Sequence, residues 1–417
     1  MCCWALAVRL QLCILVDILV HAEAFCPSWH SELVRPQRCT SLQPQRPIAR
    51  AASGEPNITS HPLALGFFAG CALATIGSAR GRRSQSAAAR LAKGVHAARQ
   101  ATPVSTEHGS ALKLFSPAKI NLFLRITQRR PDGYHDLASL FHTVSFGDTL
   151  NLELLPTSAE HDELECNLPG VPLDDSNLVI RALQLFRDRS GIQRYFRVKL
   201  EKCTPAQAGM GGGSSNAATA FFGANALCGS PASRADLLDW ANDPVIGSDA
   251  SFFLSEGTAF CTGRGEIVTP VPPLPVQDGL PLYLVKPRYG LSTPKVFKAL
   301  DLATLSTADP EDLLHTFQEH GTAHAQWIND LERPAFEVCP ELGELKAFLA
   351  GKEWGFQAVL MSGSGTTIFC LGEPHGGAAA LEAAARANGF DLEGVWSASL
   401  LRRGAGDSWY QAPASSR

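Results

Sequence analysis

Residues 202–219 read KCTPAQAGMGGGSSNAAT, and this stretch is the most informative for the fold of the chain. Glycines at positions 209 and 211–213 lack a Cβ atom, so the backbone there can turn sharply and approach an anion closely. The segment AATAFFGANAL at 217–227 predicts a helix directly after the turn. A helix N-terminus offers free N–H groups and partial positive charge to phosphate. The stretch therefore predicts a phosphate-binding loop, and the alternative is a tight connection without a ligand.

The loop differs from two common nucleotide-binding patterns. No lysine follows its glycines, as it would in a P-loop, and Ser214 stands where the dinucleotide pattern has its last glycine. The hydroxyl groups of Ser214 and Ser215 can cap the helix, bind a phosphate oxygen or reach a metal ion. The loop alone therefore predicts an anion and no particular nucleotide.

Three further blocks accompany the loop in a fixed order. They are SPAKINLFLRITQRRPDGYHDLASLFHTVSFGDTLNLELL (116–155), GSDASFFLSEGTAFCTGRGE (247–266) and VLMSGSGTTIFCLG (359–372). Together with the loop, this set resembles the GHMP small-molecule kinases. Within that superfamily the PAKINLFL and RPDGYHDL motifs are most similar to the 4-diphosphocytidyl-2-C-methyl-D-erythritol kinases. The resemblance covers roughly residues 112–403.

Strand-like and helix-like segments alternate along this region. Strands are expected at 112–116, 120–127, 143–155, 195–202, 280–287, 356–363, 366–372 and 395–401, and helices at 176–191, 217–227, 293–300 and 376–390. This order predicts an α+β fold and not a doubly wound parallel sheet. Four prolines within 270–275 mark a boundary between two lobes.

The resemblance implies a two-lobed GHMP kinase fold with the active site in the cleft between the lobes. The N-terminal lobe, at 107–275, is expected to be of the ribosomal-protein-like β-α-β type and to carry the ATP loop. The C-terminal lobe, at 276–405, is expected to be ferredoxin-like, and residues 406–417 are expected to form a tail.

Two residues are candidates for catalysis. Phosphoryl transfer to an alcohol needs an aligned hydroxyl, neutralised phosphates and a proton acceptor. From the residues alone, Asp249 is equally a helix cap, and Lys119 equally a solvated charge at a strand edge. The resemblance implies instead that Asp249 is the catalytic base and that Lys119 lies against it and the reacting hydroxyl. An ammonium group among apolar neighbours such as Ile120 and Leu122 would need such a partner.

The resemblance also implies the binding residues. Asn121 would contact the erythritol end of the substrate, Tyr134 and His135 the cytidine, and Phe297 would be a second stacking aromatic with Thr293 beside it. Periodicity alone makes Phe297 equally a core aromatic on an amphipathic helix. ATP would be bound by Pro205, Ala208, Gly209, Met210, Gly211, Gly212, Gly213, Ser214, Ser215 and Asn216. Mg²⁺ is implied by the triphosphate, with Ser215 as a candidate ligand.

Two features of the glycine turns and their surroundings remain open. The second glycine turn, at 363–366, either closes on the phosphates or only connects two strands. Ala250 and Ser251 follow Asp249 where the resembling kinases usually have an apolar residue and proline. The missing proline predicts a looser turn, which side-chain hydrogen bonds from Ser251 are expected to compensate.

Charge divides the chain into a basic leader and an acidic remainder. The formal net charge is −4, but residues 25–106 contain ten basic and two acidic residues, and residues 107–417 carry a net charge of −11. An acidic catalytic region disfavours a nucleic-acid partner. Residues 1–24 resemble a signal peptide, and 25–106 resemble a transit peptide with a second apolar run before three arginines. This predicts a bipartite leader for a plastid bounded by extra membranes, and the alternative is a secreted or membrane-anchored enzyme.

These observations predict an ATP- and Mg²⁺-dependent kinase of the non-mevalonate isoprenoid pathway. Its substrate would be a small molecule with a cytidine diphosphate moiety, phosphorylated on the 2-hydroxyl of 4-diphosphocytidyl-2-C-methyl-D-erythritol. Two alternatives remain open at this stage. One is a superfamily kinase acting on mevalonate, homoserine or a sugar, and the other is a binding relative that retains the fold without the chemistry.

Overall fold

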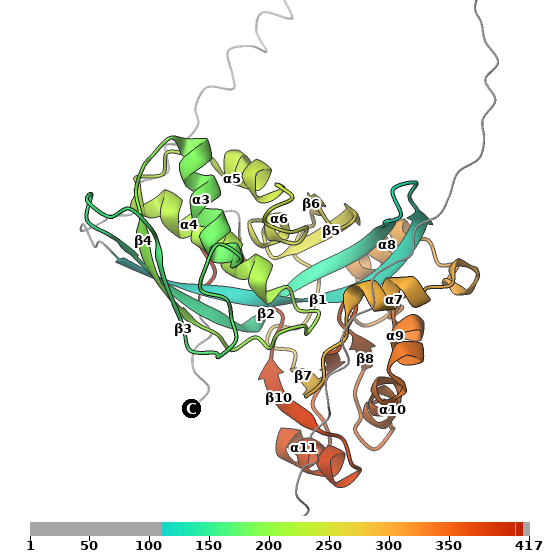
Figure 1. Cartoon of the computed structure of the whole chain (residues 1–417). Helices are drawn as coiled ribbons and strands as arrows, with labels where there is room; N and C mark the ends of the chain where they lie inside the picture. The colour runs from blue at the N-terminus through green and yellow to red at the C-terminus, as the bar shows by residue number, and fades with distance from the viewer. Residues whose placement is uncertain (1–110, 405, 412–417) are drawn as a thin grey trace, which may run out of the picture. The chain divides into compact units, whose positions relative to one another are not determined.

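The computed structural model describes residues 111–404 and 406–411, which belong to one compact unit. The predicted leader and the last six residues of the predicted tail lie outside the described residues. Within the described part, two β-sheets and their helices form the α+β fold expected from the sequence, as Figure 1 shows. None of the helices described is long and apolar enough to cross a bilayer.

The first sheet is built on a long antiparallel pair, β1 (Ala111–Arg129) and β2 (His135–Leu154). Its other strands are β3 (Glu163–Cys166), β4 (Phe196–Glu201), β5 (Thr258–Gly263) and β6 (Ile267–Pro270), in the order β3-β4-β2-β5-β6 with β1 paired to β2. Two separate strands were expected where β1 is continuous. Its register against β2 shifts between Pro117 and Lys119 and again between Asn121 and Phe123. Such bulges bend a strand and redirect its side chains, so the expected break marks an irregularity within one strand.

Four helices lie on one side of these long strands in Figure 1. They are α3 (Leu178–Ser190), α4 (Gly212–Leu227), α5 (Arg234–Ala241) and α6 (Ala250–Phe253). Helix α3 begins after an Asn177 cap and ends at Gly191 in the left-handed conformation, as its sequence predicts. Helix α4 begins at Gly212 and not at 217, so the glycine-rich turn runs directly into the helix.

The second sheet has the strand order β10-β7-β9-β8, and its paired strands are antiparallel. Its strands are β7 (Leu282–Pro287), β8 (Ala358–Met361), β9 (Ile368–Leu371) and β10 (Leu392–Ala398). The helices in this part are α7 (Thr293–Ala299), the 3₁₀ turn η1 (Leu302–Thr304), α8 (Pro310–His320), α9 (Glu332–Val338), α10 (Pro340–Leu349) and α11 (Gly377–Ala387).

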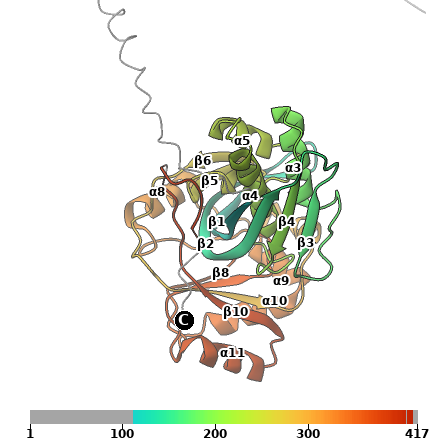
Figure 2. The same ribbon diagram turned by 90° about the vertical axis from the view of Figure 1, so that its left-hand side faces the viewer.

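The second sheet is buried on both faces. Its Val285 and Ile368 share one core cluster with Leu342 of α10 and Leu381 of α11. Another cluster joins Leu284 and Phe369 to apolar residues of β1 and β2. Figure 2 accordingly shows this sheet between the long strands and helices α10 and α11. The two sheets are separated in sequence by the proline-rich segment, while the lobe boundary at 275 stays a prediction.

Candidate active site

Lys119 and Asp249 meet where β1 passes the start of α6. The Lys119 Nζ atom lies 3.6 Å from Asp249 Oδ2, and the lysine side chain is only 5% exposed. The ammonium also lies 4.4 Å from the centroid of the Phe141 ring. Asp249 precedes the first turn of α6, but its carboxylate makes no capping hydrogen bond. Lys119 is therefore not a solvated charge at a strand edge, and Asp249 does not act as a helix cap.

A polar chain continues from the lysine along β1. Lys119 Nζ donates to Asn121 Oδ1 at 2.8 Å, and Asn121 Nδ2 donates to Ser139 Oγ at 2.9 Å. Residues two apart on a strand share a face, so Lys119 and Asn121 project together. Both side chains are buried, and the asparagine is fixed on its far side by β2. Ser139 carried no signal in the sequence analysis.

The glycine-rich turn leads into the N-terminus of α4, which no side chain caps by a hydrogen bond. Gly211 is the N-cap residue, at φ = 66°, and no side chain caps the helix. Because a helix leaves its first N–H groups unpaired, these groups are free to bind an anion. Ser214 and Ser215 lie inside the first turn and do not cap it, since the helix starts earlier than expected.

Two glycine turns pack backbone against backbone. A Cβ atom added to Gly209 would lie 2.1 Å from the carbonyl oxygen of Ser362, and one on Gly363 would lie 3.2 Å from the Gly209 carbonyl. Ser362 Oγ donates to the same Gly209 carbonyl at 3.0 Å. Asn329 donates to the carbonyl of Gly363 at 2.8 Å and so fixes the second turn from behind. The turn at 363–366 connects β8 to β9 and also packs against the glycine-rich turn before α4.

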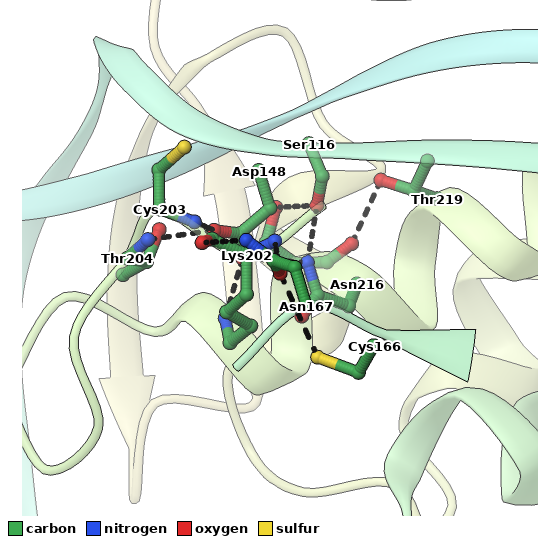
Figure 3. A network of polar contacts seen from close by, with 10 residues as sticks. Ser116, Asp148, Cys166, Asn167, Lys202, Cys203, Thr204, Asn216 and Thr219 are labelled. Atoms are coloured by element: carbon green, nitrogen blue, oxygen red, sulfur yellow. Dashed lines mark hydrogen bonds and ion pairs between the residues drawn. The ribbon is translucent and has the colours of Figure 1, made fainter. Parts of the chain in front are cut away.

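A buried carboxylate that the sequence analysis missed organises the base of the loop, as Figure 3 shows. Asp148 accepts hydrogen bonds from Lys202 Nζ at 2.5 Å, Asn216 Nδ2 at 2.9 Å and the backbone N–H groups of Cys203 and Thr204. Asp148 therefore links the residues that follow β4 to the first turns of α4. The sequence did contain a signal for this residue. Asp148 alternates with Leu150 and Leu152 along the strand and so lies on its buried face, where an acidic side chain is unusual.

Lys202 brings positive charge to the loop despite the missing P-loop lysine. Its Nζ atom lies 3.0 Å from the position of a Cβ added to Gly212. The same ammonium is paired with the buried carboxylate of Asp148, and the lysine side chain is 10% exposed. The lysine precedes the glycines in sequence, which is why a search for a following lysine could not find it.

The structure gives no support to the expectation for Ser215 and contradicts the one for Ser251. Ser215, the candidate metal ligand, is fully buried, and its hydroxyl lies 2.8 Å from Ser116 Oγ. It faces β1 and not the open side of the loop. Ser251 was expected to compensate for the missing proline, yet its buried Oγ has no hydrogen-bond partner among the described residues. The hydroxyl is enclosed by apolar packing of α6 and lacks an acceptor within reach.

The predicted cytidine residues gather around one cavity of about 760 Å³. Tyr134 and His135 line it from the β1–β2 turn, and Thr293 and Phe297 line it from α7. The rings of His135 and Phe297 are stacked, with centroids 5.4 Å apart and planes 24° apart. Ser248, the neighbour of Asp249, also lines the cavity, and its hydroxyl donates to the Asp249 carboxylate at 3.2 Å. The cavity therefore adjoins the Lys119–Asp249 pair.

The polar groups of this cavity suit a nucleobase. Burial, reinforced by the charge of Arg129, lowers the pKa of His135 below its usual value near 6.5. The imidazole is then neutral at pH 7 and offers one donor and one acceptor. The Arg264 guanidinium lies 4.8 Å from the centroid of the Tyr134 ring. This arginine lines the cavity but was not among the predicted site residues.

Comparisons with known proteins agree with this geometry. Family models of the GHMP kinases N terminal domain and GHMP kinases C terminal match residues 177–257 and 310–391. The chain is 32% identical to a solved 4-(cytidine 5'-diphospho)-2C-methyl-D-erythritol kinase, with a TM-score of 0.57, covering 70% of this chain and 100% of that one. The fold and the glycine-loop site define a GHMP kinase.

Curated relatives narrow the class further. The chain is 47% identical to the chloroplastic 4-diphosphocytidyl-2-C-methyl-D-erythritol kinase of Arabidopsis thaliana, over 73% of this chain and 78% of the relative. It is 45% identical to the same-named kinase of Protochlamydia amoebophila, over 63% of this chain and 85% of the relative. The chain belongs to the 4-diphosphocytidyl-2-C-methyl-D-erythritol kinase family.

Proposed function

We propose that this chain transfers the γ-phosphate of ATP to the 2-hydroxyl of 4-diphosphocytidyl-2-C-methyl-D-erythritol, a step of the non-mevalonate isoprenoid pathway. The observation that carries this proposal is the cavity at the Lys119–Asp249 pair. It combines the stacked rings of His135 and Phe297, suited to a cytosine, with an adjoining carboxylate suited to an alcohol. Family membership supports the same substrate.

The catalytic roles follow from the geometry of the pair. Asp249 is the proton acceptor for the substrate hydroxyl, since it is partly exposed beside the cavity and makes no capping bond. Lys119, buried and 3.6 Å away, stabilises the negative charge that develops on the transferring group. Asn121 holds the ammonium in place and contacts the erythritol end of the substrate.

ATP binds at the N-terminus of α4, with its phosphates against the backbone of residues 209–214. Pro205, Ala208 and Met210 shape the base of this turn, where Ala208 and Met210 pack into the core below β1. Asn216 acts indirectly, because its side chain bonds Asp148 and Ser116 and so fixes the start of the helix.

Magnesium is part of the proposal through the triphosphate. Among the described residues no group of three His, Cys, Asp or Glu side chains could hold a metal ion. Since Mg²⁺ in kinases is bound largely by phosphate oxygens and water, one or two protein ligands suffice. The half-buried Ser214 fits this requirement better than the fully buried Ser215 does. Bound to ATP, the ion would neutralise phosphate charge.

The cellular location is proposed on similar grounds. Curated relatives from plants are named chloroplastic, which supports a plastid. The signal-like residues 1–24 followed by the transit-like residues 25–106 support a plastid bounded by extra membranes. Deletion of 1–24 from a fluorescent fusion should then abolish plastid entry in a cell with such a plastid, and normal import would contradict the bipartite leader.

The test of the reaction is ADP release from ATP by the purified protein with 4-diphosphocytidyl-2-C-methyl-D-erythritol. Mevalonate, homoserine and galactose serve as matched alcohol substrates. Turnover with the cytidylyl compound alone is expected. Turnover with one of the other alcohols would assign the chain to another GHMP kinase activity. Binding of ATP without turnover of any substrate would identify a binding relative.

A further inference from the structure

The last described segment of the chain returns from the second sheet to the first. We call residues 400–404 and 406–410 the C-terminal clasp. Leu400 forms a bridge with Val144 of β2, and the Leu401 N–H donates to the carbonyl of Thr143 at 2.9 Å. Trp409 Nε1 donates to the carbonyl of Phe115 in β1 at 2.6 Å. The clasp is thus fixed to both long strands.

Arg403 connects the clasp to α6, the short helix preceded by Asp249. Its Nη2 atom donates to the carbonyl of Leu254 at 2.7 Å and to the carbonyl of Ser255. Leu254 is the C-cap residue of α6. The guanidinium is buried and lies 5.2 Å and 4.8 Å from the ring centroids of Trp409 and Tyr410. Both rings hold the charge in place over the end of the helix.

Helix α6 has few other polar anchors. It spans four residues, and so short a helix is marginal without tertiary contacts. At its N-terminal end Asp249 makes no capping bond, and the buried hydroxyl of Ser251 has no partner among the described residues. Arg234 donates to the Leu254 carbonyl at 3.2 Å, but its side chain is 41% exposed. The buried Tyr410 hydroxyl of the clasp also donates to the Ser255 carbonyl, at 3.4 Å. Arg403, which reaches both carbonyls, is therefore the main buried polar anchor of this helix.

The position of α6 affects both proposed catalytic groups. Asp249 lies directly before the helix, so a shift of α6 moves the carboxylate. Phe252 of α6 packs edge-on against Phe141 with centroids 5.3 Å apart, and Phe141 is the ring beneath the Lys119 ammonium. A displacement of α6 would therefore disturb the carboxylate and the support of the lysine together.

We propose that Arg403 is a positioning residue for phosphoryl transfer, which holds α6 and thereby the geometry of Asp249 relative to Lys119. The proposal rests on the proposed function. Arg403 does not line the cavity, and its side-chain hydrogen bonds go to Leu254 and Ser255 and not to the glycine-rich turn, so substrate binding should not depend on it. A misplacement on the order of 1 Å can lower kcat by about 100-fold.

The test compares Arg403→Gln with Arg402→Gln in the full chain. Arg402 is the neighbouring arginine and also bonds carbonyls, those of Leu274 at 2.9 Å and Val276 at 3.1 Å, away from α6. Arg403→Gln should lower kcat by about 10- to 100-fold, with KM for both substrates within about twofold. It should also speed hydrogen–deuterium exchange in residues 250–256. Arg402→Gln should change neither quantity.

The proposal requires both the lower kcat and the faster exchange in Arg403→Gln. Both are measured below the unfolding temperature of each variant. An unchanged kcat, a loss of kcat without faster exchange in 250–256, or an equal loss in Arg402→Gln would overturn the proposal. If Arg403→Gln does not fold, a stop after Asp407 removes both rings and keeps the arginine, with a stop after Gln411 as its control. A wild-type chain without turnover contradicts the proposed function, while the exchange comparison still tests the anchor.

Discussion

At the scale of single residues, the proposed reaction depends on the Lys119–Asp249 pair. Replacing Asp249 by Asn should lower kcat by about 10²–10⁴, because the proton acceptor is lost, with little change in KM for ATP. Steady-state ADP release checks this. Asp309→Asn is the matched control, since Asp309 caps α8 by accepting from the Glu311 N–H at 2.8 Å and lies outside the cavity. Near-normal turnover in Asp249→Asn would contradict the assignment.

The stacked pair in the cavity gives a prediction for substrate binding. Phe297→Leu should raise KM for the cytidylyl substrate by about tenfold and leave KM for ATP unchanged, since an aromatic pair contributes about 0.5–1.5 kcal/mol beyond its buried area. Phe356→Leu, which removes an aromatic packed on Tyr283 outside the cavity, is the control. Equal changes in both KM values would indicate a structural effect and not a cytidine contact.

Sequence reasoning at this scale found residues with unusual chemistry and missed their supports. Asp249 was ambiguous because a capping aspartate and a catalytic one have the same local sequence, and only the absent capping bond separates them. Asp148 was missed because its partners, Lys202 and Asn216, are distant along the chain. The contact of Ser215 with Ser116 was not predicted, because sequence does not tell which way a hydroxyl in a helix points.

At the scale of elements, the contact between the two glycine turns is expected to affect both ATP binding and the stability of the fold. Gly209→Ala should raise KM for ATP and destabilise the fold, because its Cβ would lie 2.1 Å from the Ser362 carbonyl. Gly229→Ala is the matched control, since Gly229 also has positive φ, at 83°, but has open space around it. Backbone strain of about 1–2 kcal/mol is common to both variants, so any excess in Gly209→Ala measures the clash.

Thermal unfolding and ATP titration of the two variants check this prediction. Equal loss of stability and equal ATP affinity would show that the turns can separate without consequence. From the sequence, the long strands and helices α3, α4, α7 and α11 were predictable by period and turn residues. The short strands β3, β5 and β6 and helices α5, α6, α8, α9 and α10 were not expected. The packing of one glycine turn on the other was not, because it depends on backbone contacts between residues about 150 positions apart.

At the scale of the whole molecule, His142 sets a limit on acid stability. It is fully buried in β2, its Nδ1 lies 2.8 Å from the Thr143 carbonyl, and its Nε2 has no partner among the described residues. Burial lowers its pKa from 6.5 to about 4. Because the unfolded chain takes up this proton at a higher pH than the folded one, stability falls as the pH drops below 6.5.

The free energy of unfolding should therefore fall by about 2 kcal/mol between pH 7 and pH 5 through this group alone. Urea unfolding at both pH values measures the change. His142→Gln removes the titrating group, so its loss over the same interval should be smaller by that amount. An identical pH dependence in the wild type and the variant would show that His142 titrates normally.

The arrangement of the two sheets follows from topology and from the apolar pattern of their strands, which the sequence predicted as an α+β fold. The sequence did not predict that the chain returns to the first sheet after β10. Trp409 and Tyr410 lie in a stretch expected to be a tail, yet both are buried against the first sheet. A short segment with two aromatics carries no periodic signal, so only the tertiary contacts of Arg403 and Trp409 reveal its role.

The most direct test of the central claim is the ³¹P NMR spectrum of the product formed from ATP and 4-diphosphocytidyl-2-C-methyl-D-erythritol. The proposed reaction predicts one new phosphomonoester resonance from a phosphate on the 2-hydroxyl, with the diphosphate of the substrate intact. With Asp249→Asn the same resonance should grow about 10²–10⁴-fold more slowly. A phosphate on another hydroxyl, cleavage of the diphosphate, or product formation by Asp249→Asn at the wild-type rate would contradict it.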